Sequence, residues 1–154
     1  MINSQKLQLV AWNDEKPTGE VNSSCAHSKG LMAYSSTAQK GVLFVHSVPK
    51  YPAIVGGQVQ ATVASSQNIY GQNMACFSLT LKEMDDIAQF MLITMPFVYG
   101  GTVTDTSATR NLYKLATSHF VANADPFNRH EFRSPLGFNL KTIYKNDKVN
   151  ASIF

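Results

Sequence analysis

An apolar stripe at helical spacing, preceded by a helix-start signal, is the feature that most constrains the fold of this sequence. Thr80 is a favourable N-cap residue, and Glu83, three residues later, completes a capping box. The apolar positions of the stripe are Leu81, Met84, Ile87, Ala88, Met91 and Leu92. Because they recur every three or four residues, we expect a helix over residues 81–93, ended by Pro96, with its methionine-rich face in the core.

Short apolar runs bounded by turn-forming residues predict strands before this helix. We expect these strands at residues 6–12, 30–35, 41–47 and 74–79. The second and third runs flank a short polar loop, so they should pair as a hairpin. The rest of the chain is expected to contain surface loops at residues 53–72 and 100–109, a shorter helix at residues 110–119 and a strand at residues 138–144. Strands beside helices, without a regular βαβ order, predict a mixed α/β layer fold.

The composition favours a single domain that works outside the cytosol. A length of 154 residues is typical of one domain. Charged residues make up only 15% of the chain, so uncharged polar residues must supply much of the surface, which suits a secreted or lysosomal protein. The net charge of +3 and the four histidines favour a polyanionic partner at acid pH. No apolar run approaches the ~20 residues of a membrane span, so we expect no membrane partner.

His27 and Lys29 lie two residues apart, just before the second expected strand. In extended backbone such residues point to the same face, so an imidazole and an ammonium can reach one phosphate. The imidazole can attack phosphorus or transfer a proton, and the ammonium can neutralise the non-bridging oxygens. The simpler interpretation is a pair of side chains at the solvated end of a strand. His46 ends the neighbouring strand and is either the partner of His27 or a buried histidine bonded to backbone.

Four blocks of sequence, spread over about residues 7–99, resemble the deoxyribonuclease II family. They read LQLVAWND at residues 7–14, HSKG at 27–30, VHSVPKYP at 45–52 and YGQNMACFS at 70–78. The resemblance implies a phospholipase D-like sheet with flanking helices, of which one half is incomplete. It also implies an acid endonuclease that cuts DNA without a metal ion or other cofactor and leaves 3′-phosphate ends.

The resemblance also assigns roles to individual residues. His27 would be the nucleophile or proton donor, Lys29 would clamp the phosphate, and His46 matches a position close to the family's active site. Lys50 and Tyr51 could line a DNA groove through phosphate contact and base stacking, although two exposed residues after a strand are the simpler interpretation.

The sequence departs from the family pattern at two points. The family brings two His-x-Lys motifs to one phosphodiester, and this sequence contains one, at His27. The family often has an Asp soon after the Lys, and residues 31–36 contain no acid. Three interpretations remain open. Residues 1–154 are a single domain truncated at both ends, or a homodimer in which each copy supplies one motif, or a catalytically degenerate secreted DNA-binding protein.

Cysteines and glycosylation motifs bear on the compartment. The resemblance implies that Cys76 pairs with a cysteine from a segment absent here, so a bridge from Cys76 to Cys25 and two free thiols are both open. Asn22 and Asn150 begin glycosylation motifs. The apolar stretch at residues 7–12 is too short for a signal peptide, so we expect any leader to lie outside this sequence. His119, His130, Asp125 and Glu131 fit no standard zinc spacing, so we expect no metal site.

Overall fold

The structure, a computed structural model, describes residues 7–67, 69–121, 127–134, 137 and 139–146. Within these residues the main element is a five-stranded antiparallel sheet with the strand order β6-β3-β2-β1-β7. Its strands are β1 (Gln8–Trp12), β2 (Gly30–Ser35), β3 (Lys40–His46), β6 (Met74–Thr80) and β7 (Val98–Gly101). A mixed α/β fold was expected, and this sheet with its helices confirms it.

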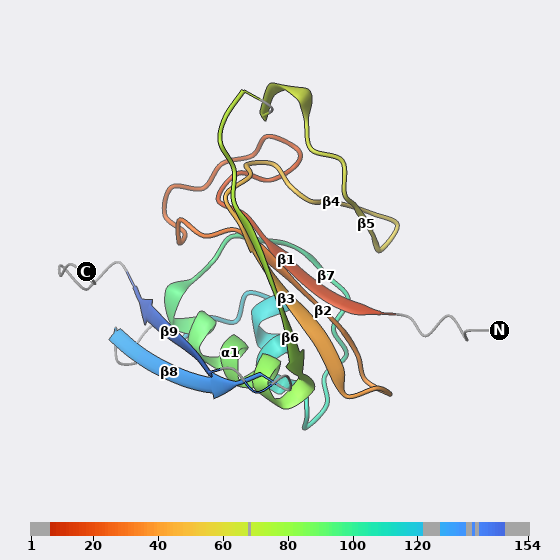
Figure 1. The fold of residues 1–154 in the computed structure, drawn as a ribbon, viewed down its shortest axis with the longest axis vertical. Helices are drawn as coiled ribbons and strands as arrows, with labels where there is room; N and C mark the ends of the chain where they lie inside the picture. Colours follow the sequence, from red (N-terminus) through yellow and green to blue (C-terminus); the bar gives the residue numbers. More distant parts are fainter. Residues whose placement is uncertain (1–6, 68, 122–126, 135–136, 138, 147–154) are drawn as a thin grey trace.

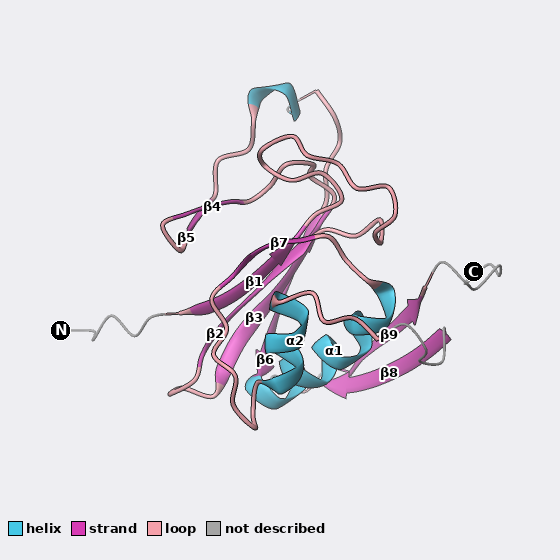
Figure 2. Ribbon diagram, turned by 180° about the vertical axis from the view of Figure 1, so that it is seen from behind, coloured by secondary structure: helices cyan, strands magenta, loops and turns pink. Residues whose placement is uncertain are grey.

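Both α-helices pack against one face of this sheet (Figures 1 and 2). They are α1 (Leu81–Thr94) and α2 (Arg110–Ala116). A hairpin of β8 (Phe127–Arg133) and β9 (Asn139–Lys145) lies against α1. A second small hairpin, β4 (Ala53–Val55) with β5 (Gln58–Gln60), is followed by the 3-10 turn η1 (Ser65–Gln67). No helix in the described ranges is both long and apolar enough to cross a membrane.

The two faces of the sheet have separate apolar clusters because successive strand residues point to opposite sides. The helix-covered face carries the main core, with Val10, Trp12, Met32, Tyr34 and Leu43 from the strands packed against the stripe of α1. The opposite face carries a smaller cluster of Leu9, Ala11 and Leu31, against which Ala33, Phe44, Ile54 and Tyr99 pack. Burial of alternate residues on both faces fixes the strand register, because a shift by one residue would exchange the two sets.

Helix α1 confirms the expectation drawn from the apolar stripe. The Thr80 side chain accepts a hydrogen bond from the Glu83 backbone N–H, while the Glu83 carboxylate accepts one from the Thr80 backbone, so the capping box is complete. All the apolar positions of the stripe are buried. The helix ends at Met95, whose φ of 55° places it in the left-handed region just before Pro96.

The four strands expected before α1 and the tail strand are confirmed within two residues at each end. The second helix is shorter than expected because Thr117 and Ser118 end it after Ala116. Strand β7 was assigned in part to a loop because Gly100 and Gly101 are poor strand residues. The fold uses them because a Cβ on Gly101 would lie 2.9 Å from the Ala116 Cβ of α2.

The surface loop expected at residues 53–72 is wrong in its first part, which forms the β4–β5 hairpin. Gly56 and Gly57, with φ of 57° and 76°, make its tight turn. Two glycines between apolar residues are a recognised hairpin signal, and consecutive positive φ values favour glycine at both positions.

The core beneath the sheet should depend strongly on Met84. Its side chain is fully buried, so Met84→Ala should lower the free energy of unfolding by about 2–5 kcal/mol through lost burial and a cavity. Gln89→Ala, at an exposed position of the same helix, should change it by less than about 0.5 kcal/mol. Urea unfolding followed by circular dichroism measures both, and equal losses for the two variants would contradict this packing.

Candidate active site

Antiparallel pairing brings the four resembling blocks to one end of the sheet. Trp12 at the end of β1 pairs with Gly30 at the start of β2, and Gly30 pairs with Val45 near the end of β3. His46 then pairs with Met74 at the start of β6. The residues that follow or precede these positions therefore emerge at the same edge, in the group of loops drawn at the top of Figure 1.

Hydrogen bonds connect these loops to one another. The fully buried Asn13 donates from Nδ2 to the carbonyl oxygens of Val48 at 3.1 Å and Tyr51 at 2.9 Å. The Ser47 hydroxyl donates to Gln72 Oε1 at 2.5 Å and accepts from the Asn73 backbone N–H at 3.0 Å. Because buried amide groups need their partners, the bonds of Asn13 fix the first and third blocks together.

His27 and Lys29 meet at a single carboxylate, that of Asp14. His27 Nε2 lies 2.8 Å from Asp14 Oδ2, and Lys29 Nζ lies 2.5 Å from Asp14 Oδ1. The expectation that the imidazole and the ammonium can reach one anion is therefore met by an anion of the protein itself. The Lys29 side chain is 8% exposed and that of His27 is 87% exposed, so the ammonium is held in place while the imidazole faces solvent.

Asp14 is the functional residue that the sequence interpretation missed. An acid was sought directly after Lys29, in residues 31–36, and none is present there. The structure supplies one from the end of β1 instead, because the pairing of β1 with β2 places residue 14 beside residues 27–29. The signal was the Asn-Asp pair in the first resembling block, which the sequence alone explains equally well as a turn.

His46 lies behind this cluster. The side chain is 7% exposed, and its ring lies 5.2 Å from that of Tyr51 and 5.5 Å from that of Phe44. Burial, followed by the charge of Lys29, lowers the pKa of His46 to about 4; the Val48 backbone opposes this, without hydrogen-bond geometry. His46 is therefore neutral at about pH 5, and no contact between it and His27 is found in the described residues.

Lys50 and Tyr51 do not occupy the positions that a DNA groove would require. Tyr51 is 8% exposed and packs against His46, so its ring offers no open face to a base. Lys50 Nζ lies 3.0 Å from Glu15 Oε1, in an ion pair next to Asp14. Both residues support the loop arrangement rather than lining an exposed groove.

The remaining predicted residues lie apart from the cluster or outside the described ranges. Cys25 and Cys76 are free thiols, so the structure contains no bridge between them, and burial raises the pKa of the Cys25 thiol. The Asn22 side chain accepts a hydrogen bond from the Ser24 backbone within its exposed loop. Asn150 lies outside the described residues. No group of three potential metal-ligating side chains is found in the part of the chain that the structure describes.

The interaction between Asp14 and Lys29 should appear as coupling in a double-mutant cycle. Asp14→Asn leaves a buried ammonium without its counter-charge, and Lys29→Met leaves the carboxylate without its cation. Each single change should lower the free energy of unfolding by about 1–3 kcal/mol, and the double variant should lose clearly less than the sum. Urea unfolding at pH 7 measures the cycle. The exposed pair Lys82–Asp86 is the control and should show much smaller coupling; additive losses at Asp14 and Lys29 would exclude the interaction.

His46 should make the protein less stable as the pH falls. Between about pH 6.5 and pH 4 the unfolded chain binds a proton at this histidine that the folded chain does not, so the free energy of unfolding should fall by about 3 kcal/mol over that range. His46→Leu should remove this part of the pH dependence, whereas His119→Leu, at an exposed position, should leave it. Thermal unfolding from pH 8 to pH 4 tests this, and parallel curves for wild type and His46→Leu would refute it.

Comparison with known proteins agrees with the arrangement at this edge of the sheet. The family model described as deoxyribonuclease II matches residues 1–154. Plancitoxin-1 of Acanthaster planci is 32% identical over 153 residues, covering 96% of this chain and 41% of that protein. Deoxyribonuclease-2-alpha of Bos taurus is 31% identical over 100 residues, covering 63% and 27%. A putative deoxyribonuclease-2 of Burkholderia thailandensis is 28% identical over 145 residues, covering 90% and 39%. The chain spans about two fifths or less of the length of these relatives, and it belongs to the deoxyribonuclease II family.

Proposed function

We propose that this chain supplies one His-x-Lys half of the active site of a DNA-cleaving hydrolase. The observation that carries this is the contact of His27 and Lys29 with the two oxygens of one carboxylate. A carboxylate and a phosphodiester both present two anionic or polar oxygens at similar spacing. The Asp14 carboxylate therefore marks where a phosphate can be held by both cations at once.

The chemistry follows from the exposure of the two groups. The exposed imidazole of His27 is accessible for attack on phosphorus or for protonation of the leaving oxygen. In the first role a bond from nitrogen to phosphorus forms while the bond to the 5′-oxygen breaks; water then releases a 3′-phosphate. Lys29 neutralises charge on the non-bridging oxygens. Asp14 orients both groups and must yield its position, at least in part, to the phosphate.

The proposal includes metal independence and an acid optimum. The cluster neutralises the phosphate with an imidazole and an ammonium, so it needs no cation of another kind. A histidine of ordinary pKa is mostly protonated at about pH 5, which supplies the charge that binds DNA and the proton that a leaving oxygen requires. His46 stays neutral at that pH, so its role is to pack behind the loops and not to act as the acid.

The second half of the site must come from outside the single motif seen in this sequence. A phospholipase D-like arrangement would take it from the remainder of a longer protein or from a second copy of this chain. DNA as the partner and a lysosomal or secreted location are part of the same proposal. The named deoxyribonuclease-2 relatives support the first. The low charge content and the exposed motif at Asn22 support the second.

Cleavage of supercoiled plasmid by the 154-residue chain at about pH 5, with excess chelator, tests this function directly. His27→Ala should abolish nicking, because it removes the group that attacks phosphorus or protonates the leaving oxygen. His119→Ala is the matched control, since that histidine is exposed on another element and should leave the rate unchanged.

Two results would contradict the proposal. Equal cleavage by wild type and His27→Ala would exclude His27 from the chemistry. No cleavage by a chain shown to be folded, even at high protein concentration where two copies can associate, would instead favour a catalytically degenerate DNA-binding protein. The single His-x-Lys motif of this sequence is the observation that keeps this second candidate open.

A further inference from the structure

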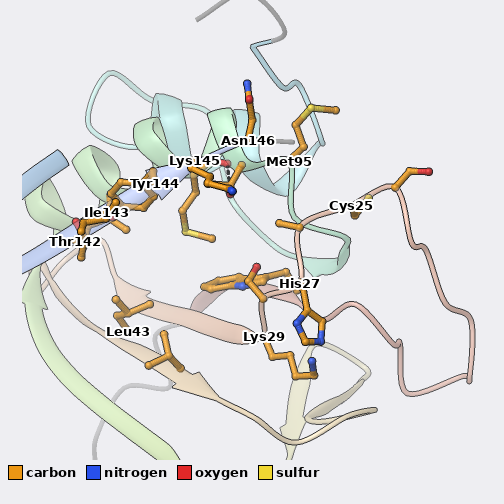
Figure 3. A pocket seen from close by; sticks show the side chains of 18 of the residues that line it. Cys25, His27, Lys29, Leu43, Met95, Thr142, Ile143, Tyr144, Lys145 and Asn146 are labelled. Carbon is orange, nitrogen blue, oxygen red and sulfur yellow. Dashed lines mark hydrogen bonds between the residues drawn. The ribbon is translucent and has the colours of Figure 1, made fainter. Parts of the chain in front are cut away.

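A cavity of about 700 Å³ opens beside the His27 and Lys29 cluster. It lies between the helix-covered face of the sheet, α1 and β9. Figure 3 shows His27 and Lys29 side by side at one end, with Thr142, Ile143 and Tyr144 at the other. The volume is within the range of about 300–1,000 Å³ that is usual for sites of small organic ligands. The proposed hydrolysis uses only the end of this cavity that His27 and Lys29 form.

The inner lining is apolar and includes aromatic rings. Trp12 comes from β1, Leu43 and Val45 from β3, Met91 from α1 and Tyr144 from β9. Trp12 is held against the sheet because β2 has a glycine beneath it. A Cβ on Gly30 would lie 2.5 Å from Trp12 Cζ2. The pairing of β1 with β2 therefore places a broad aromatic side chain next to the residues that contact the phosphate.

The charge of the lining selects the kind of ligand. The residues around the cavity include His27, Lys29 and Lys145, and among the described lining residues there is no Asp or Glu. Asp14 reaches His27 and Lys29 from outside the lining. A cavity that combines basic side chains at its opening with an apolar, aromatic interior matches a ligand with an anionic group and a flat ring.

We propose that this cavity binds the nucleobase of the nucleotide whose phosphate is contacted by His27 and Lys29. The inference rests on the proposed function, because that function places a DNA phosphate at the mouth of the cavity. A base that enters must leave its stack, so the substrate at the point of cleavage is an unpaired or extruded nucleotide. Contacts with Trp12 and Tyr144 replace the lost stacking, and they accept any base because every base has a flat aromatic face.

Trp12 is a direct probe of this binding, because it is the single tryptophan of the sequence. Titration of its fluorescence compares three ligands on the 154-residue chain. A deoxynucleoside 3′-monophosphate has both phosphate and base, deoxyribose 3-phosphate lacks the base, and hexyl phosphate replaces the base by a flexible apolar chain. We expect the nucleotide to bind at least about tenfold more tightly than deoxyribose phosphate and clearly more tightly than hexyl phosphate, since stacking of one base contributes about that factor.

Two substitutions on one strand provide a matched pair. Val45→Phe fills the cavity, whereas Val42→Phe adds the same ring to the opposite face of β3. The first should remove the affinity difference between nucleotide and deoxyribose phosphate, and the second should retain it. Circular dichroism of both variants establishes that they are folded. Because the three-ligand comparison on the wild-type chain needs no variant, it decides the question even if Val45→Phe fails to fold.

The outcomes separate this inference from the proposed function. Equal binding of nucleotide and deoxyribose phosphate would overturn the base site while leaving the phosphate site in place. Hexyl phosphate binding as tightly as the nucleotide would also overturn it, and would assign the cavity to an alkyl or lipid phosphate. If none of the three ligands binds, both the phosphate site and the base site fail. His27→Ala should weaken all three ligands alike and leave the contribution of the base unchanged.

Discussion

Antiparallel pairing of three adjacent strands is the constraint on which the site depends. The register that aligns Trp12 with Gly30 and Gly30 with Val45 is set by burial on both faces of the sheet. It brings together residues that are far apart in the chain, at the end where three strands begin or finish. A shift of one residue would expose the core positions and would separate Asp14 from His27 and Lys29.

The site combines a rigid support with an exposed reacting group. Asn13 is fully buried, and its amide bonds hold the loop that contains Tyr51. Lys29 is largely buried and is paired with Asp14, so its ammonium has a defined position. His27, on the same carboxylate, faces solvent. Support of this kind lets one imidazole move toward a substrate while the charge that binds the phosphate stays in place.

Burial also separates the roles of the two histidines at this edge of the sheet. His27 and His46 both looked suitable for proton transfer, because both end strand-like segments. The fold places His46 among Phe44 and Tyr51, where burial lowers its pKa to about 4. It thus contributes packing and a pH-dependent loss of stability, while His27 remains available for chemistry. The half-site is also consistent with the relatives, which are at least twice as long as this chain.

The sequence by itself determined the local elements and the residue types of the site. The capping box and stripe of α1, the first strands and the spacing of His27 and Lys29 follow from short-range periodicity, which needs no knowledge of distant contacts. Only the tertiary structure decided that Asp14 completes the cluster, that Tyr51 and His46 are buried, and that Gly100 and Gly101 form a strand. The physical reason is that these outcomes depend on which distant strand or helix packs against each residue. Neither spacing nor composition encodes that information locally.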